Sequence, residues 1–363
     1  MSRIVILGGT GAMGTYLTKE LEKNYEVWVT SRRKNLSCGN VRFIKGDAHD
    51  NIFLNELLSN QHFVAIVDFM NYRTAEYEQR VGKLLSNTDQ LIFLSSSRVY
   101  DDSNTAITEE SDRLLDVSKD TKFVATDDYA LAKARQEDIL KSSGMRNWTI
   151  IRPYMTYYPY RLDLGYFPKE LWLYRILKGR TIIMPKDVAE KTVTLTHGKD
   201  VAKGIASIIG KEEALGEIFH ITENTNNTWG QILENYVSVI RSHGYQVKIK
   251  YVDEPSYKRD YIYRYDRLFN RRFNNSKINK YIDTGKFQNA IDGTKECMEE
   301  FLNSPRFLNI DWKIQAAWDR ETNEVTPYSE IGTLKNKVIY FLFRHIFSYY
   351  KCKELYHRVK HNN

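Results

Sequence analysis

Cysteine is scarce in this chain, and the few cysteines present form no pattern. Cys38, Cys297 and Cys352 are odd in number, lie far apart and match no metal-ligand or redox spacing. The sequence therefore predicts free thiols in a reducing compartment. It offers no candidate residues for a metal centre.

Long hydrophobic runs are missing as well. No stretch approaches the ~20 apolar residues of a membrane-spanning helix, and the short run at Arg3–Leu7 leads straight into glycines rather than forming a signal peptide. We therefore expect a cytoplasmic protein. There is no clear linker and no internal repeat, so 363 residues with 42% hydrophobic content predict one large domain with a smaller lobe, or two domains.

Positive charge is in excess but unevenly distributed. The formal net charge is +7, and seven Lys and Arg but only one Glu follow residue 333. The remaining chain is close to neutral, which argues against a general nucleic-acid binder and favours an enzyme acting on small anionic molecules.

The C-terminal tail, residues 331–363, mixes apolar and aromatic residues with these cations. Two interpretations stay open for its segment 334–363. It forms an interfacial helix that makes peripheral contact with an anionic membrane, or it docks on its own lobe or on a second subunit.

Short apolar runs alternate with helical patterns in the first half of the chain. The predicted strands are 3–7, 26–30, 41–45, 63–69, 91–95 and 148–152, with helices that include 74–85 and 127–141. This alternation predicts right-handed crossovers and a parallel sheet covered on both faces. The expected fold class is α/β, a doubly wound (Rossmann) sheet with a smaller C-terminal substrate-binding lobe.

A glycine-rich loop connects the first predicted strand and helix. Glycines at a spacing of three allow a tight turn and let the backbone approach a pyrophosphate at a helix N-terminus. A turn without a ligand is the alternative, but this strand–loop–helix context favours a dinucleotide site. The predicted loop contacts are Gly8, Thr10, Gly11, Ala12, Met13 and Gly14.

The end of the second strand lacks the acid that NAD-selective folds place against the ribose 2′-hydroxyl. Ser31, Arg32 and Arg33 stand there instead, and a guanidinium can grip a 2′-phosphate. The sequence therefore predicts NADP rather than NAD, unless the arginines only form a solvated loop. Asp47, after the third strand, is placed to meet the adenine edge, although an Asp after Gly is also ordinary turn chemistry.

Tyr129 and Lys133 are four residues apart on a predicted helix. They share one face, so the ammonium can sit beside the phenol and favour its ionised form. Such a pair suits proton transfer next to a nicotinamide. An exposed helix pair without a catalytic role is the alternative.

These motifs together resemble the extended short-chain dehydrogenase/reductase family, which includes nucleotide-sugar epimerases, dehydratases and reductases. The resemblance covers roughly residues 2–240 and rests on motifs in this order: the glycine loop, Asp47, Ser96 before Tyr100, 107–111, Tyr129 with Lys133, 151–153, 196–197 and 200–202. It implies that Tyr129 is the acid/base, that Lys133 holds the nicotinamide ribose, and that Pro153 contacts the cofactor. It also implies that Ser96 binds the substrate oxygen, although a serine at a strand end often only caps the next turn.

Two departures from the family narrow the expected reaction. Ser97-Arg98 replaces the Asp-Glu pair of the dehydratases, which disfavours 4,6-dehydration, and Met155 stands where epimerases of uridine diphosphate sugars commonly have Asn. The resemblance then implies NADP-dependent reduction or epimerisation of a nucleotide-activated keto-sugar, for surface polysaccharide synthesis, by a homodimer.

The predicted NADP-binding domain spans residues 1–155, with 188–222 returning to it. Residues 156–187 and 223–330 form the predicted substrate-binding lobe. An RNA-binding or scaffold protein that senses NADP on the same fold is the alternative function. RNA-binding relatives of this fold have lost the Tyr–Lys arrangement, so its presence here favours catalysis.

Overall fold

A computed structural model describes residues 1–33, 35–253, 260–349 and 351–352. The chain folds into two compact units. The first comprises residues 1–158, 194–226 and 271–290, and the second comprises residues 159–193, 227–270 and 291–363.

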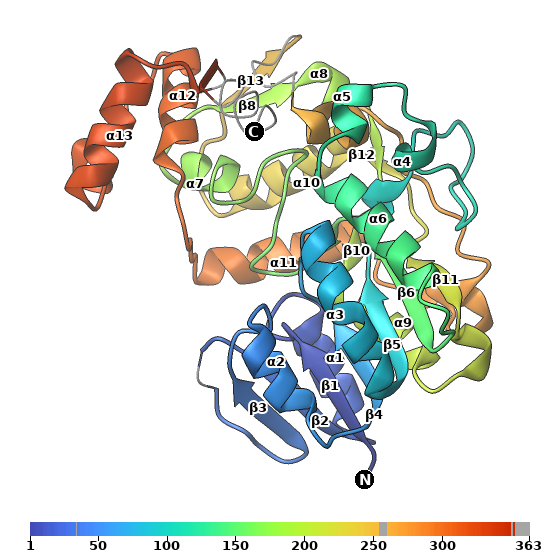
Figure 1. Cartoon of the computed structure of the whole chain (residues 1–363). Coiled ribbons are helices and arrows are strands. Elements are labelled where there is room, and N and C mark those ends of the chain that lie inside the picture. The colour runs from blue at the N-terminus through green and yellow to red at the C-terminus, as the bar shows by residue number, and fades with distance from the viewer. Residues whose placement is uncertain (34, 254–259, 350, 353–363) are drawn as a thin grey trace. The chain divides into compact units, whose positions relative to one another are not determined.

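A seven-stranded sheet forms the centre of the first unit (Figure 1). Its order is β11-β6-β5-β4-β1-β2-β3, and every neighbouring pair is parallel. The predicted doubly wound α/β fold is therefore confirmed. The strands are β1 (Arg3–Leu7), β2 (Glu26–Ser31), β3 (Val41–Lys45), β4 (Phe63–Asp68), β5 (Thr88–Leu94), β6 (Trp148–Pro153) and β11 (Glu217–Ile221).

Helices cover both faces of this sheet. One apolar cluster joins α1 (Gly14–Leu21) and α9 (Gly198–Ile208) to the side chains of alternate strand residues such as Ile4 and Ile6. A second cluster joins α2 (Asn51–Leu58), α3 (Thr74–Ser86) and α6 (Tyr129–Lys141) to the opposite face, including Val5 and Leu7. Burial on both faces explains the nearly continuous apolar runs of the strands. The short helices α4 (Leu114–Val117) and α5 (Thr121–Val124) precede α6.

The direction of the strand order reverses at β1. From β1 the chain proceeds to β2 and β3 on one side, and then crosses to β4 on the other side. Leu7 at the end of β1 pairs with Asp68 at the end of β4. In open α/β sheets, ligands bind at the carboxyl ends of the strands at such a switch point.

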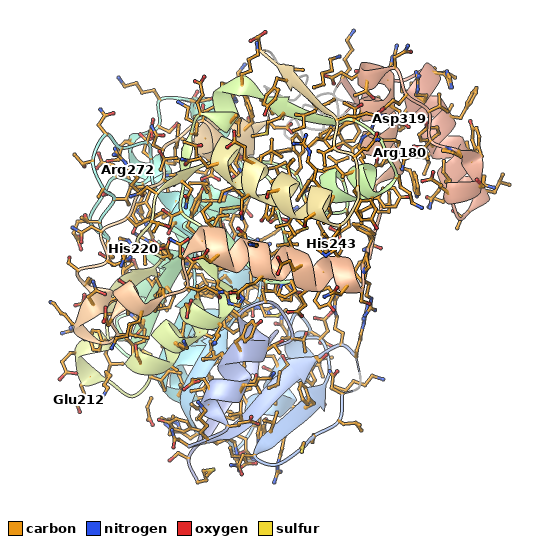
Figure 2. All side chains as sticks on the ribbon, turned by 180° about the vertical axis from the view of Figure 1, so that it is seen from behind. Arg180, Glu212, His220, His243, Arg272 and Asp319 are labelled. Carbon is orange, nitrogen blue, oxygen red and sulfur yellow. The ribbon has the colours of Figure 1, made fainter. Side chains whose placement is uncertain are left out.

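The segments that return to the first unit are residues 194–226, within six residues of the predicted 188–222 at each end, and residues 271–290. The seventh strand, β11, lies within the predicted returning segment, and the residues before it supply β9 (Thr192–Val193), β10 (Thr196–His197) and α9. Pairing of β10 with β7 (Thr156–Tyr157) is within the first unit, to which residues 194–226 belong. Residues 271–290, predicted in the lobe, also belong to the first unit. Ile107 donates its N–H to Arg272 O, and His220, labelled in Figure 2, donates from Nε2 to Asn274 O at 2.7 Å.

The second unit is mainly helical. Its strand pairs are β8 (Ile182–Pro185) with β13 (Ile249–Val252) and β9 with β12 (Asn227–Thr228). Its helices are α7 (Trp172–Leu177), α8 (Lys186–Ala189), α10 (Trp229–Ser242), α11 (Ala290–Asn303), α12 (Trp312–Thr322) and α13 (Leu334–His345).

Buried polar contacts hold the last two helices of this unit. Asp319 on α12 pairs with Arg175 at 2.6 Å and accepts a hydrogen bond from Tyr340 Oη on α13 at 2.6 Å. The Thr326 hydroxyl links Asp319 to Arg180, and both are labelled in Figure 2. The described part of the predicted tail therefore docks on its own unit through Tyr340.

A buried ion pair ties α6 to the sheet of the first unit. Arg152 on β6 donates to Glu137 on α6 at 2.8 and 2.6 Å, and both side chains are at most 1% exposed. Burial alone would raise the pKa of Glu137, but Arg152 lowers it below its ordinary value. Ser95 Oγ at the end of β5 donates to the same carboxylate. These contacts fix the second half of α6 against the ends of two strands.

We predict that Glu137→Gln destabilises the protein by about 3–5 kcal/mol, because the variant leaves the Arg152 charge buried without a counter-charge. Urea unfolding followed by circular dichroism measures this change. Glu20→Gln removes a carboxylate from the surface pair with Lys23 and should cost about 0.5 kcal/mol or less. Equal effects of the two substitutions would contradict the structural role assigned to Glu137.

Candidate active site

The glycine loop forms the tight turn that its sequence predicts. Gly8 has a φ of +71°, a conformation that favours glycine, and its N–H donates to Thr30 Oγ1 at 2.9 Å. A Cβ on Gly14 would lie 2.5 Å from Gly9 O. The loop therefore passes directly over the start of α1.

The N-terminus of α1 suits an anionic group. Its N-cap residue, Met13, makes no side-chain capping bond, and the first turn contains no acid. Gly11 is exposed, and a Cβ there would meet nothing within 4 Å. The first backbone N–H groups of a helix have no partner within that helix, so open space at this N-terminus fits the pyrophosphate of a dinucleotide. Thr10 and Ala12 lie in the same loop.

The end of β2 lies beside this loop in the sheet. Ser31 is buried, and its Oγ accepts hydrogen bonds from Arg33 N and Asn35 Nδ2. Arg32 and Arg33 are exposed. No carboxylate belongs to this strand end over residues 30–33. Asp47, after β3, is half-buried and accepts from His49 N at 3.0 Å.

Three consecutive serines follow β5, and two of them point into the protein. Ser95 binds Glu137, and Ser97 Oγ donates to Arg152 O at 2.7 Å. Ser96 lies between them and caps a short 3₁₀ turn by accepting from Arg98 N at 3.2 Å. The capping role left open by the sequence is therefore present, and the role of Ser96 toward a substrate stays a prediction. Its hydroxyl proton is still available for donation.

Tyr129 is the first residue of α6. Asp128 caps this helix by accepting from Ala130 N. The Arg98 guanidinium carbon lies 5.0 Å from the centre of the Tyr129 ring, and Arg98 pairs with Asp128 at 3.8 Å. The half-buried phenol therefore faces a cation from the loop after β5, a contact that the sequence did not predict.

Lys133 lies one turn further along α6 and is only 2% exposed. Its Nζ donates to Leu94 O at 2.8 Å and to Met70 O at 3.3 Å, and lies 4.8 Å from the centre of the Phe93 ring. Burial lowers the pKa of Lys133 to about 8, although Asp68 and Glu137 oppose the shift. The carboxyl ends of β4 and β5 thus hold the ammonium at the switch-point edge of the sheet.

Asp68 is a buried residue of this edge that the sequence analysis did not identify. It ends β4, and Oδ1 accepts from Met70 N at 3.0 Å and Tyr72 Oη at 3.2 Å. Burial raises the pKa of Asp68 to about 6, against the opposing effects of Met70 N–H and Lys133. A lone acid inside the apolar run 63–69 was the available sequence signal.

The end of β6 carries the last predicted contact, Pro153, which is buried and pairs with Ile221 of β11. Met155 follows with a φ of +35°. Asn enters this left-handed region more readily than Met. The backbone at this position therefore has the conformation that an Asn suits, while the side chain differs.

The site combines three features: a glycine loop at the switch point of the sheet, a serine after β5, and a Tyr–Lys pair at the start of the next long helix. Together they define a nicotinamide-dependent protein of the short-chain dehydrogenase/reductase class. The chain belongs to the NAD dependent epimerase/dehydratase family, whose model matches residues 4–222. The predicted membership in the extended branch of that class is confirmed.

Individual relatives differ in what their names describe. The chain is 30% identical over 237 residues to the chloroplast stem-loop binding protein of 41 kDa b of Arabidopsis thaliana; the match covers 61% of this chain and 58% of that protein. It is 22% identical over 330 residues to a UDP-N-acetyl-alpha-D-glucosaminuronate decarboxylase of Bacillus cytotoxicus, covering 82% of this chain and 97% of the decarboxylase.

A solved structure shares the fold. The UDP-glucose 4-epimerase of Bifidobacterium longum in complex with NAD+ and UDP has a TM-score of 0.62 at 18% identity, covering 84% of this chain and 99% of the epimerase.

We predict that Gly11→Ala leaves the fold intact but weakens NADPH binding at least tenfold. The added methyl group meets no protein atom, but it occupies the space into which a pyrophosphate would fit. Quenching of tryptophan fluorescence by NADPH measures affinity, and thermal unfolding reports the fold.

Gly82→Ala is the matched control, because that glycine on α3 also has open space around its Cβ position. NADPH should bind this control as it binds the unaltered protein. Unchanged affinity in Gly11→Ala would place the dinucleotide elsewhere.

Proposed function

We propose that this protein is an NADP-dependent enzyme that reduces or epimerises a nucleotide-activated keto-sugar, for surface polysaccharide synthesis. The observation that carries the proposal is the placement of Tyr129 and Lys133. Tyr129 begins α6, with the Arg98 guanidinium over its ring. Lys133 is held by two main-chain carbonyls at the switch-point edge of the sheet.

The proposed roles follow from these positions. Ser96 donates a hydrogen bond to the substrate oxygen, and Tyr129 gives a proton to that oxygen or takes one from it. Lys133 binds the ribose hydroxyls and, with Arg98, favours the ionised phenol after proton transfer. The nicotinamide supplies or accepts the hydride at the sugar carbon when it is bound.

The chain offers residues suited to each part of the cofactor. The glycine loop and the α1 N-terminus hold the pyrophosphate, Ser31, Arg32 and Arg33 hold the 2′-phosphate, Asp47 meets the adenine edge, and Pro153 lines the nicotinamide end. The absence of an acid at the end of β2 supports NADP over NAD. Exchangeable NADP in turn favours net reduction over epimerisation.

RNA binding is the second candidate, and one relative favours it: the Arabidopsis protein is named for stem-loop binding. Against it stand the near-neutral first 333 residues and the retained Tyr129 and Lys133. The two candidates are separated by measuring binding of a labelled RNA hairpin at two salt concentrations, because phosphate contacts weaken as salt rises.

A homodimer and a peripheral membrane contact of residues 334–363 stay predictions. No helix within the described residues is long and apolar enough to cross a membrane. Leu334, Val338 and Phe341 on α13 are exposed, at a spacing that places them on one helix face, which supports a surface contact.

We predict that combined Arg32→Ala and Arg33→Ala substitutions weaken NADPH binding about tenfold to a hundredfold and leave NADH binding within about twofold. The reason is that only NADPH carries the 2′-phosphate that a guanidinium grips. Isothermal titration with both cofactors measures the two affinities. Equal losses for NADPH and NADH would contradict the assignment of a 2′-phosphate site.

We further predict that Tyr129→Phe lowers turnover at least a thousandfold while NADPH affinity changes less than about threefold. Phenylalanine keeps the ring under Arg98 but has no proton to exchange. Oxidation of NADPH in the presence of a panel of nucleoside diphosphate keto-sugars measures turnover. An active variant would remove Tyr129 from the mechanism, and an inactive unaltered protein that binds RNA tightly would favour the second candidate.

A further inference from the structure

Asp68 has one carboxylate oxygen without a hydrogen-bond partner. The side chain is fully buried, and Oδ1 takes both of its hydrogen bonds, from Met70 N and Tyr72 Oη. Oδ2 is buried and takes none. A buried acceptor without a hydrogen-bond partner lowers the stability of the folded protein, and native proteins rarely retain one without a role.

Four ionisable side chains surround this carboxylate. Lys133 comes from α6, Arg80 and Tyr77 come from α3, and Tyr72 precedes α3. The two tyrosines are neutral, because burial raises the pKa of each well above its ordinary value. The charge of Asp68 is therefore balanced by Arg80 or by Lys133.

Arg80 stacks on the Tyr72 ring, with its guanidinium carbon 4.5 Å from the ring centre, and makes most of its polar contacts outside the Asp68 cluster. Its guanidinium donates to Ala48 O at 2.9 Å, to His49 O and to Asn51 Oδ1, and it pairs with Glu76 at 3.0 Å. Lys133 has two neutral carbonyl acceptors, and the contact to Met70 O is long at 3.3 Å. An ammonium has three donors, so Lys133 can turn from Met70 O to another acceptor without leaving its place on α6.

We propose that Asp68 is a positioning residue that acts through Lys133, as the counter-charge that keeps the buried ammonium protonated where it meets the cofactor ribose. The inference rests on the proposed function for the identity of the cofactor. It assigns a role to a fully buried carboxylate at the end of β4. Glu137, the other acid acting on Lys133, is already paired with Arg152.

The direction of the pH effect follows from the charges. Burial favours the neutral form of Lys133, and Asp68 favours the charged form. Removing the carboxylate therefore lowers the pKa of Lys133 further, so that the ammonium loses its proton at a lower pH. Cofactor binding that depends on the ammonium should then weaken at a lower pH than in the unaltered protein.

Asp68→Asn tests this inference, since the amide oxygen can still accept from Met70 N and Tyr72 Oη. We expect the midpoint of the alkaline loss of NADPH affinity to fall by about one pH unit or more. Asp89→Asn is the control, because Asp89 is a carboxylate of the same sheet that pairs on the surface with His62. An unchanged pH profile in Asp68→Asn would overturn the inference, whereas absence of NADPH binding in the unaltered protein would overturn the proposed function.

A stability cycle tests the same pair without any ligand. Lys133→Met leaves the Asp68 carboxylate buried and uncompensated, so this variant should unfold at a lower urea concentration than Lys133→Met combined with Asp68→Asn. If the double variant is the less stable of the two, Asp68 and Lys133 do not compensate each other and the inference fails. This readout decides the matter even where Asp68→Asn alone proves too unstable to titrate.

Discussion

The ion pair between Arg152 and Glu137 is the constraint on which the geometry of the candidate site depends. It joins β6 to α6 in a place that water does not reach, and Ser95 at the end of β5 bonds to the same carboxylate. Ser97 bonds to the backbone of Arg152. Ser96 lies between two serines whose side chains are fixed, and Lys133 lies one helical turn before Glu137. The pair therefore sets the distance from the strand ends to the helix that carries the Tyr–Lys motif.

Burial shifts the pKa values of the two charged groups at the switch-point edge of the sheet. Lys133 and Asp68 are both removed from water, and burial moves the pKa of each toward neutrality, one downward and the other upward. Groups shifted in this way are typical of sites that move protons at neutral pH. The main-chain carbonyls of Leu94 and Met70 offset part of the cost of burying the ammonium. The parallel sheet supplies these acceptors because its strands end together.

Local patterns in the sequence were sufficient for the sheet and the motifs but not for contacts between distant segments. Apolar runs separated by helical patterns identify strands that are buried on both faces. Five of the six predicted strands therefore agree with the structure to within one residue, whereas β5 begins three residues before its predicted start and β11 was not among the predicted strands. Residues 271–290 contain no such periodicity, and their place in the first unit depends on pairing with Ile107 and His220, far away in sequence. The sequence does not single out Asp68, because one acid that closes an apolar run is also typical of an ordinary strand end. Its importance appears only when α6 brings Lys133 beside it.

The burial of Lys133 also bears on the choice between catalysis and RNA binding. A lysine that binds RNA must reach the phosphates, and the affinity it gives comes from releasing counterions at an exposed surface. Lys133 is 2% exposed and donates to two backbone carbonyls, so it cannot reach an RNA phosphate in this conformation. A buried ammonium beside a carboxylate with an unpaired oxygen costs stability in any fold. Such a cost in stability is typical of a functional site. Of the two candidate functions, only the enzyme, which uses a cofactor at the ends of β4 and β5, assigns a role to Lys133 and Asp68.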